Sequence, residues 1–307
     1  MTTSKPAAAS TLRQMLNKVP EITLYFWVIK VLCTTVGETA ADFLNENLGL
    51  GLTNTTWVMS VLLVAALALQ FGFRRYVPSI YWLAVVLISI VGTLITDNLT
   101  DNLGVSLVTT TILFSVALAV VFAVWWASER TLSIHTIFTT RREGFYWLAV
   151  LFTFALGTAA GDLAAERINL GYALSGIMFA AMIAAVALGH FRLRANAVLA
   201  FWIAYILTRP LGASLGDYMS QARADGGLAL GTVVTSALFL GSIVAVVLFL
   251  TITRRDQTPV QTVSSVELEP HLHLPHPHVP HPHVPHPHLP EVHLPNVVPP
   301  KTAGDEA

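Results

Sequence analysis

The chain has 307 residues, of which 54% are hydrophobic and only 11% are charged, and its formal net charge is −1. Water-soluble domains carry about a quarter charged residues, so this composition excludes an ordinary soluble protein. The near-zero net charge argues against a nucleic-acid partner. The single cysteine, Cys33, excludes a framework of intrachain disulfides.

Eight apolar stretches follow a short polar segment, residues 1–20. Each has about the 20 residues that a helix needs to cross ~30 Å of hydrocarbon. Helices satisfy their own backbone hydrogen bonds in lipid, and the stretches lack the alternation typical of barrel strands. We therefore predict an all-α polytopic membrane protein with eight transmembrane helices, at about 22–44, 53–72, 79–99, 106–127, 145–165, 172–190, 197–218 and 228–252.

One pattern recurs four times along the chain: a tryptophan, a glycine ten residues later, and an aspartate five residues beyond the glycine. The tryptophan–glycine pairs are Trp27 and Gly37, Trp82 and Gly92, Trp147 and Gly157, and Trp202 and Gly212. Each unit contains two predicted helices, so all four have the same orientation in the membrane. The predicted membrane domain, residues 21–255, thus consists of four tandem repeats at about 25–80, 81–144, 145–199 and 200–255.

The basic residues predict the orientation. They gather in the two terminal segments and in alternate loops, whereas the opposite loops hold only Arg167 and Arg223. Because basic residues favour the cytoplasmic side, both termini should be cytoplasmic and the protein should lie in the lipid bilayer as a multi-pass protein. The repeated tryptophans then fall near the cytoplasmic interface, which favours their interpretation as an interfacial belt. The repeated glycines favour close helix packing.

The repeated aspartates are the candidate site. They are Asp42, Asp97, Asp162 and Asp217, and each is followed four residues later by a second polar residue: Glu46, Asp101, Glu166 or Gln221. Acidic side chains within a bilayer are costly and usually face a polar interior. Carboxylates from equivalent helices would form an oxygen-rich site suited to Mn²⁺ or another hard divalent cation. The alternative is that these acids simply end their helices at the outer water interface.

Three charged residues break the repeat pattern. Glu38 stands where the other repeats have Thr93, Thr158 and Ala213, and it is added to the candidate site. Lys30 and Arg209 are candidate counter-charges for these acids. For Lys30 we favour a side chain that extends to the cytoplasmic interface, and for Arg209 a buried partner.

The composition changes abruptly after Arg255. Residues 256–307 are rich in proline and histidine and predict a disordered cytoplasmic tail. Imidazole is a ligand for Zn²⁺, Ni²⁺, Co²⁺ and Cu²⁺, so the tail is a candidate metal-binding segment. The alternative is a solvated segment of low complexity. Its candidate ligands are His276, His278, His281, His283, His286 and His288.

The four tryptophan-marked units resemble a bacterial family of membrane-anchored proteins. That family is built from four tandem copies of a two-helix repeat of unknown function, each with a characteristic tryptophan. The resemblance covers residues 25 to about 252 and implies the fold and a location in the bacterial inner membrane. It implies no activity, and the tail lies outside it.

Two functions are compatible with these observations. The first is a secondary transporter, specifically an exporter, of a divalent metal cation that uses the repeated acids and collects metal with the tail. The second is a non-transporting membrane scaffold or partner-binding protein whose acids are structural. We expect no enzyme and no required cofactor, since no catalytic constellation stands out. The sequence does not define an oligomeric state.

Overall fold

A computed structural model describes residues 17–257, apart from the side chains of Glu46 and Asn47. The chain divides into two units, residues 1–260 and 261–307, and every described residue belongs to the first. The predicted tail therefore lies outside the described residues, except for Asp256 and Gln257. Its six candidate metal ligands lie outside them as well.

The described chain is all-α, as predicted, and contains eight long helices. Their bounds agree with the predicted stretches to within a few residues. The largest difference is in the fifth long helix, which begins at Thr140 rather than at 145. The helices are α2 (Leu24–Asp42), α3 (Leu52–Gly72), α4 (Pro78–Asp97), α5 (Leu107–Glu129), α6 (Thr140–Asp162), α7 (Gly171–Leu193), α8 (Ala197–Ser220) and α9 (Gly231–Thr253).

Seven of these helices, α3 to α9, are long and apolar enough to cross a membrane, counted over residues 17–257. The protein is therefore a multi-pass membrane protein. The prediction of eight apolar spans needs one correction: α2 is not among the seven. It carries Lys30 and Glu38, whose side chains are buried by α2's neighbours α4, α8 and α9 and the nearby α6. Inside the bundle the charges are shielded from lipid, so α2 can be less apolar than the others.

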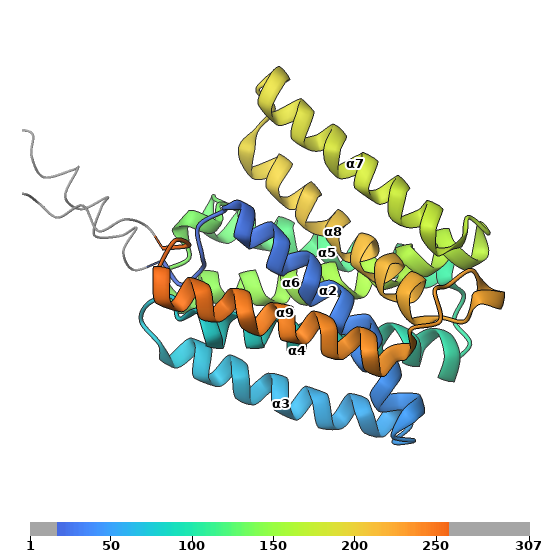
Figure 1. The fold of residues 1–307 in the computed structure, drawn as a ribbon. Helices are drawn as coiled ribbons and strands as arrows, with labels where there is room; N and C mark the ends of the chain where they lie inside the picture. The colour runs from blue at the N-terminus through green and yellow to red at the C-terminus, as the bar shows by residue number, and fades with distance from the viewer. Residues whose placement is uncertain (1–16, 258–307) are drawn as a thin grey trace, which may run out of the picture. The chain divides into compact units, whose positions relative to one another are not determined.

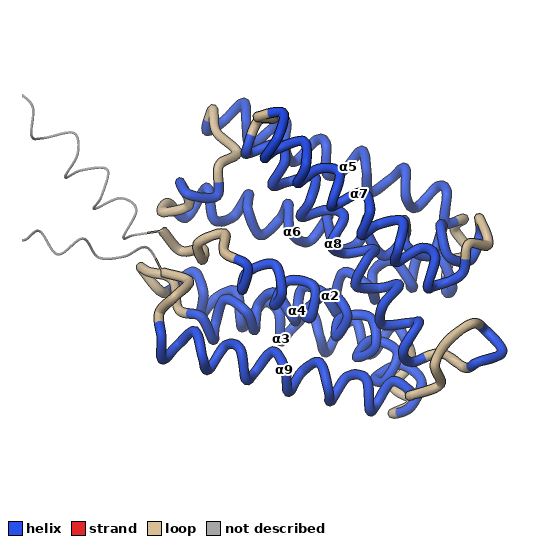
Figure 2. Tube along the Cα trace, turned by 45° about the horizontal axis from the view of Figure 1, so that its top comes forward, coloured by secondary structure: helices blue, strands red, loops and turns tan. Residues whose placement is uncertain are grey.

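The first helix of each repeat belongs to an inner ring. Going round the ring, α2 packs against α4, α4 against α6, α6 against α8, and α8 against α2 again. The second helix of each repeat lies outside this ring and packs on the inner helix of the following repeat. The outer helix α9 of the last repeat packs on α2, which closes the arrangement (Figure 1 and Figure 2).

The repeated glycines make the inner ring tight, as the sequence predicts. A Cβ atom at any of them would collide with the next inner helix, because the two backbones approach closely. The four contacts follow the ring in order: Gly37 against Ser89, Gly92 against Phe154, Gly157 against Arg209, and Gly212 against Thr34.

The repeated tryptophans do not form a belt facing lipid, so that interpretation is wrong. Trp82, Trp147 and Trp202 are only 1%, 3% and 4% exposed, and Trp27 is partly buried. The indole rings of Trp82, Trp147 and Trp202 contact other aromatic rings inside the bundle, at edge-to-face or tilted angles. Each one lies early on its inner helix, where the four helices together supply enough apolar and aromatic surface to bury the indole rings.

Both ends of the described chain lie at the same end of the bundle (Figure 1). The backbone N–H of Glu21 donates to the carbonyl of Asp256 at 2.9 Å. Lys18, from the segment predicted to be a polar tail, is buried and pairs with Glu143 at 2.7 Å. The last residues of that segment are thus part of the folded bundle, and we call this end the terminal end.

Candidate cation site

The repeated aspartates lie at the opposite end of the inner ring. Asp42, Asp97 and Asp162 are each the last residue of an inner helix, and each is followed by a wider, π-helical turn. Such turns are often found at functional sites because they redirect the side chains of a helix. Asp217 differs, since α8 continues past it to Ser220 without such a turn. The π-helical turns are Phe43–Asn47, Asn98–Asn102 and Leu163–Arg167.

A cavity of about 190 Å³ lies between these helix ends. All four repeated aspartates and Glu38 line it, together with three of the four residues predicted as a second polar shell. The fourth, Glu46, has a side chain outside the described part of the structure. The residues that line the cavity are Glu38, Asp42, Asn45, Leu52, Asp97, Thr100, Asp101, Leu107, Asp162, Glu166, Tyr172, Asp217 and Gln221.

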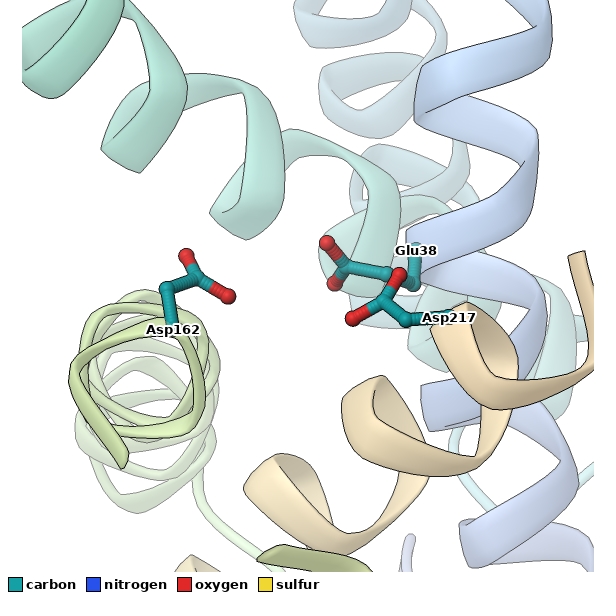
Figure 3. Close-up of side chains that lie close together, drawn as sticks. All are labelled: Glu38, Asp162 and Asp217. Atoms are coloured by element: carbon teal, nitrogen blue, oxygen red, sulfur yellow. The ribbon is translucent and has the colours of Figure 1, made fainter. Parts of the chain in front are cut away.

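Three of the carboxylates converge more closely than the rest. Glu38 on α2, Asp162 on α6 and Asp217 on α8 each offer one oxygen, and these oxygens lie within 4.8 Å of one another. Figure 3 shows the three side chains pointing into a common space. Oxygen ligands of hard divalent cations lie ~2.0–2.6 Å from the ion, so ligands of one ion are at most about 5 Å apart. The spacing therefore fits one cation held by three helices.

Asp42 and Asp97 line the same cavity without belonging to this close group. Asp42 nevertheless has an interaction of its own and is not a free acid. Asp101, Glu166 and Gln221 are further members of the lining. The structure thus brings the predicted acids together in one cavity. Three of them are close enough to share one ion, and the others add negative charge around it.

Arg209 supplies the counter-charge to Glu38. Its side chain is fully buried, and its Nη2 donates to Glu38 Oε2 at 2.7 Å. The guanidinium also donates to the Thr158 hydroxyl at 2.7 Å, to the Thr34 carbonyl at 3.2 Å and to the Thr93 hydroxyl. A buried partner for Arg209 is what the sequence predicts, and the partner is the acid of the first repeat.

Lys30 does not extend to the cytoplasmic interface, so that prediction is wrong. The residue is 1% exposed, and its Nζ lies 3.9 Å from the ring centroid of Phe154 and 4.2 Å from that of Tyr205. It forms no ion pair with Glu38, which Arg209 holds instead. The physical reason is the closed inner ring: α2 is surrounded by other helices there, so a long side chain finds aromatic faces before it finds water.

Sequence reasoning did not assign Thr93 and Thr158 to the site. Both hydroxyls contact Arg209, and both residues are fully buried. A signal was present, because they occupy in repeats two and three the position that Glu38 occupies in the first. Equivalent positions of the inner helices therefore build one polar cluster around the guanidinium.

Apolar helices around a carboxylate-lined cavity define a polytopic membrane protein built from four equivalent units. The chain belongs to the family described as Repeat of Unknown Function (DUF347), which matches residues 25–76, 80–131, 145–196 and 200–256. The four matches confirm the four tandem repeats and cover more than half of the chain. No curated protein and no solved structure matches the chain.

Proposed function

We propose that the protein is a secondary transporter of a divalent cation and that the carboxylate-lined cavity is its cation site. The observation that carries the proposal is the meeting of Glu38, Asp162 and Asp217 from three inner helices in one cavity. Acids that merely ended their helices at a water interface would have no reason to converge. Substrate sites of transporters built from repeats commonly lie where the repeats meet.

The charge of the cavity selects a cation. Seven carboxylates line it, and its lining contains no lysine or arginine among the described residues. An anion entering this space would be repelled, whereas a divalent cation would neutralise two of the charges. The donors are all oxygens, which suit hard ions such as Mn²⁺, Mg²⁺ and Ca²⁺ rather than ions that prefer nitrogen or sulfur.

The Arg209–Glu38 pair links cation binding to the packing of α8 against α2. A cation bound by Glu38 competes with Arg209 for the same carboxylate, since Arg209 donates directly to it. Loss of this bond weakens a contact between the first and last repeats, on α2 and α8. Movement of one repeat against another around a central site is how such proteins alternate their access.

The direction that we propose is export. Both termini are predicted to be cytoplasmic, so the histidine-rich tail lies on the side from which metal would be collected. The cavity is lined by the aspartates that end the inner helices α2, α4 and α6, and this end corresponds to the predicted extracytoplasmic side.

The test uses the full chain, purified and reconstituted in vesicles of phosphatidylethanolamine and phosphatidylglycerol. Mn²⁺ binding and radioactive Mn²⁺ flux are measured for the parent and for Asp162→Asn and Asp217→Asn. We expect each substitution to weaken binding by about tenfold or more, because one charged ligand is lost. Asp225→Asn is the matched control, since Asp225 is exposed and does not line the cavity.

Two results would overturn the proposal. One is parental binding and flux in both cavity variants, and the other is a parent protein that moves no divalent cation. In either case the non-transporting scaffold becomes the better explanation of the acids. A deletion strain screened for sensitivity to Mn, Zn, Ni, Co and Cu then identifies the physiological ion, if there is one.

A further inference from the structure

A groove on the outside of the bundle lies between the outer helix α5 of the second repeat and the inner helix α8 of the fourth. Its volume is about 740 Å³, which falls within the ~300–1,000 Å³ of small-molecule sites. It shares no lining residue with the cation cavity. The groove is therefore a feature that the transport function proposed above does not use.

The groove exists because the four repeats do not pack identically. In the last repeat, the outer helix α9 packs on α2 and also contacts the next inner helix, α4. In the second repeat, the outer helix α5 packs on α6, and the groove lies where α5 faces the next inner helix, α8. The rings of Phe122 and Trp202, whose centroids are 4.9 Å apart, join α5 to α8 at the groove.

Both walls of the groove are apolar and follow helical spacing. Phe122 and Trp126 lie on one face of α5, and Leu199 and Ile203 lie on one face of α8. Trp126 and Leu199 are 53% and 60% exposed, so the groove opens towards the lipid. The wall from Leu199 to Ile206 runs for about 10 Å along α8. An elongated apolar space of this kind suits a hydrocarbon chain.

One end of the groove is polar and offers hydrogen-bond donors. Arg130, Thr131 and Asn196 line it. The side-chain oxygen of Asn196 accepts from the backbone N–H groups of Val198 and Leu199 at 3.0 and 3.1 Å, which leaves its amide nitrogen as a donor. Among the described residues that line the groove, none is acidic. Such a set of donors suits the oxygens of a phosphate group.

Arg130 carries a charge that is not neutralised within residues 17–257. Its guanidinium lies over the Trp126 ring, 4.9 Å from the centroid, and forms no ion pair in this part of the chain. The adjacent acid, Glu129, pairs instead with Arg142 at 2.8 Å and with Arg141 at 3.5 Å. Stacking on Trp126 holds the guanidinium at the groove. A ligand with a negative charge would therefore complete this end.

The polar end of the groove lies on the predicted cytoplasmic side. Arg130 ends α5, and the loop that follows leads to α6, where Glu143 of the first turn pairs with Lys18 at the terminal end. The indole N–H of Trp202 donates to the carbonyl of Leu132 at 2.9 Å, which ties this loop to α8. Anionic headgroups are found on this side of the bilayer, and basic pockets between membrane helices bind them.

We propose that the groove binds an anionic phospholipid of the cytoplasmic leaflet, with the chemistry of phosphatidylglycerol. Arg130, Thr131 and Asn196 donate to its phosphate, and one acyl chain lies between Trp126 of α5 and Leu199 of α8. A zwitterionic phospholipid fits less well, because its ammonium group would add positive charge beside Arg130. The bound lipid fills the space between the second and fourth repeats. This binding does not depend on the transport function.

Native mass spectrometry of the purified full-length protein tests the proposal. The protein is released from micelles that contain equal amounts of phosphatidylglycerol and phosphatidylethanolamine. The parent should retain phosphatidylglycerol preferentially, and Arg130→Gln should weaken its retention about tenfold, because a charge-assisted bond to the phosphate is lost. Arg194→Gln is the matched control, since Arg194 follows α7 in the same left-handed conformation and does not line the groove.

Leu199→Trp tests the acyl-chain part of the site without a change of charge. The larger ring occupies the groove and should reduce the retained phosphatidylglycerol as well. Val124→Trp adds the same ring at an exposed position of α5 outside the groove and is the control. Thermal unfolding is a second measurement, because a lipid that binds the folded protein raises its melting temperature. Phosphatidylglycerol should stabilise the parent and both controls more than Arg130→Gln and Leu199→Trp.

Four results would overturn the lipid site. The first is equal retention of phosphatidylglycerol by the parent, Arg130→Gln and Leu199→Trp, and the second is a parent without preference for this lipid. The third is a lipid-independent dimer that the parent forms and Leu199→Trp does not, which would place a second copy in the groove. The fourth is a preference that appears only after truncation behind residue 257, which would show that the tail occupies the groove in the full chain.

Discussion

Arg209 and Glu38, which are 171 residues apart in the chain, form a buried ion pair of 2.7 Å beside the carboxylate cavity. The pair joins the first repeat to the last, because Glu38 lies on α2 and Arg209 on α8. The guanidinium of Arg209 thereby neutralises one of the converging acids. It also stabilises the contact between α8 and α2, which completes the ring of inner helices.

Removal of Arg209 alone should be strongly destabilising. Arg209→Gln leaves Glu38 buried without its counter-charge, and breaking a buried pair in this way costs about 3–5 kcal/mol. The double variant Glu38→Gln with Arg209→Gln should lose less than the sum of the two single losses, because no unpaired charge remains. Unfolding in mixed micelles with increasing denaturing detergent measures the free energy. Strictly additive losses would show that the two side chains do not stabilise each other.

The substitution Gly212→Ala should weaken the packing of α8 against α2, the contact that completes the inner ring. An alanine Cβ there would lie 3.0 Å from the backbone nitrogen of Thr35 and would overlap the Thr34 side chain. Overpacking of this kind costs about 1–3 kcal/mol. Gly241→Ala on α9 is the control, since nothing lies within 4 Å of the added atom. Thermal unfolding of the two variants should differ clearly, and equal melting temperatures would contradict the close approach of α8 and α2.

The stability of the terminal end should depend on pH through Asp256. Burial raises the pKa of this carboxyl above its usual value, in spite of the bond from Tyr76. A carboxyl with a raised folded-state pKa binds more protons folded than unfolded, so stability falls as pH rises from its ordinary pKa to the raised one. Asp256→Asn keeps an acceptor for Tyr76 and should flatten this dependence. The free energy of unfolding of both proteins, measured across the acidic pH range, tests this prediction. An equal slope against pH in the parent and in Asp256→Asn would show that Asp256 does not cause the dependence.

Metal binding by the tail should be separable from binding by the cavity. Truncation after residue 257 removes all six predicted histidine ligands and leaves the Tyr76–Asp256 contact in place. We expect the truncated protein to lose most of its Ni²⁺ and Zn²⁺ binding near neutral pH and to keep its Mn²⁺ binding. The lost component should also disappear from the full chain in acid, because protonated imidazole is not a ligand. Calorimetric titration with each ion is the measurement. Undiminished Ni²⁺ binding by the truncated protein would show that the tail is not the Ni²⁺-binding segment.

Much of the architecture could be predicted from local features of the chain. Apolar length determined the helices, and the fixed spacing from Trp147 to Gly157 and Asp162 defined the repeat. Because equivalent residues of tandem repeats fall at equivalent depths, the clustering of the aspartates at one end also followed from spacing. The close helix packing at the glycines was predictable as well, because small residues in membrane helices mainly allow two helices to approach closely.

Only the tertiary structure decided which way each side chain faces. The tryptophans have the depth of an interfacial belt, yet they point inwards, because the ring of four inner helices offers them an aromatic core. Lys30 has a long, flexible side chain that would reach water from an isolated helix, and the closed ring leaves it between Phe154 and Tyr205. The choice of Arg209 as the partner of Glu38 likewise depends on α8 returning to α2. Sequence spacing determines depth and periodicity, whereas orientation towards a neighbour arises only when the helices pack.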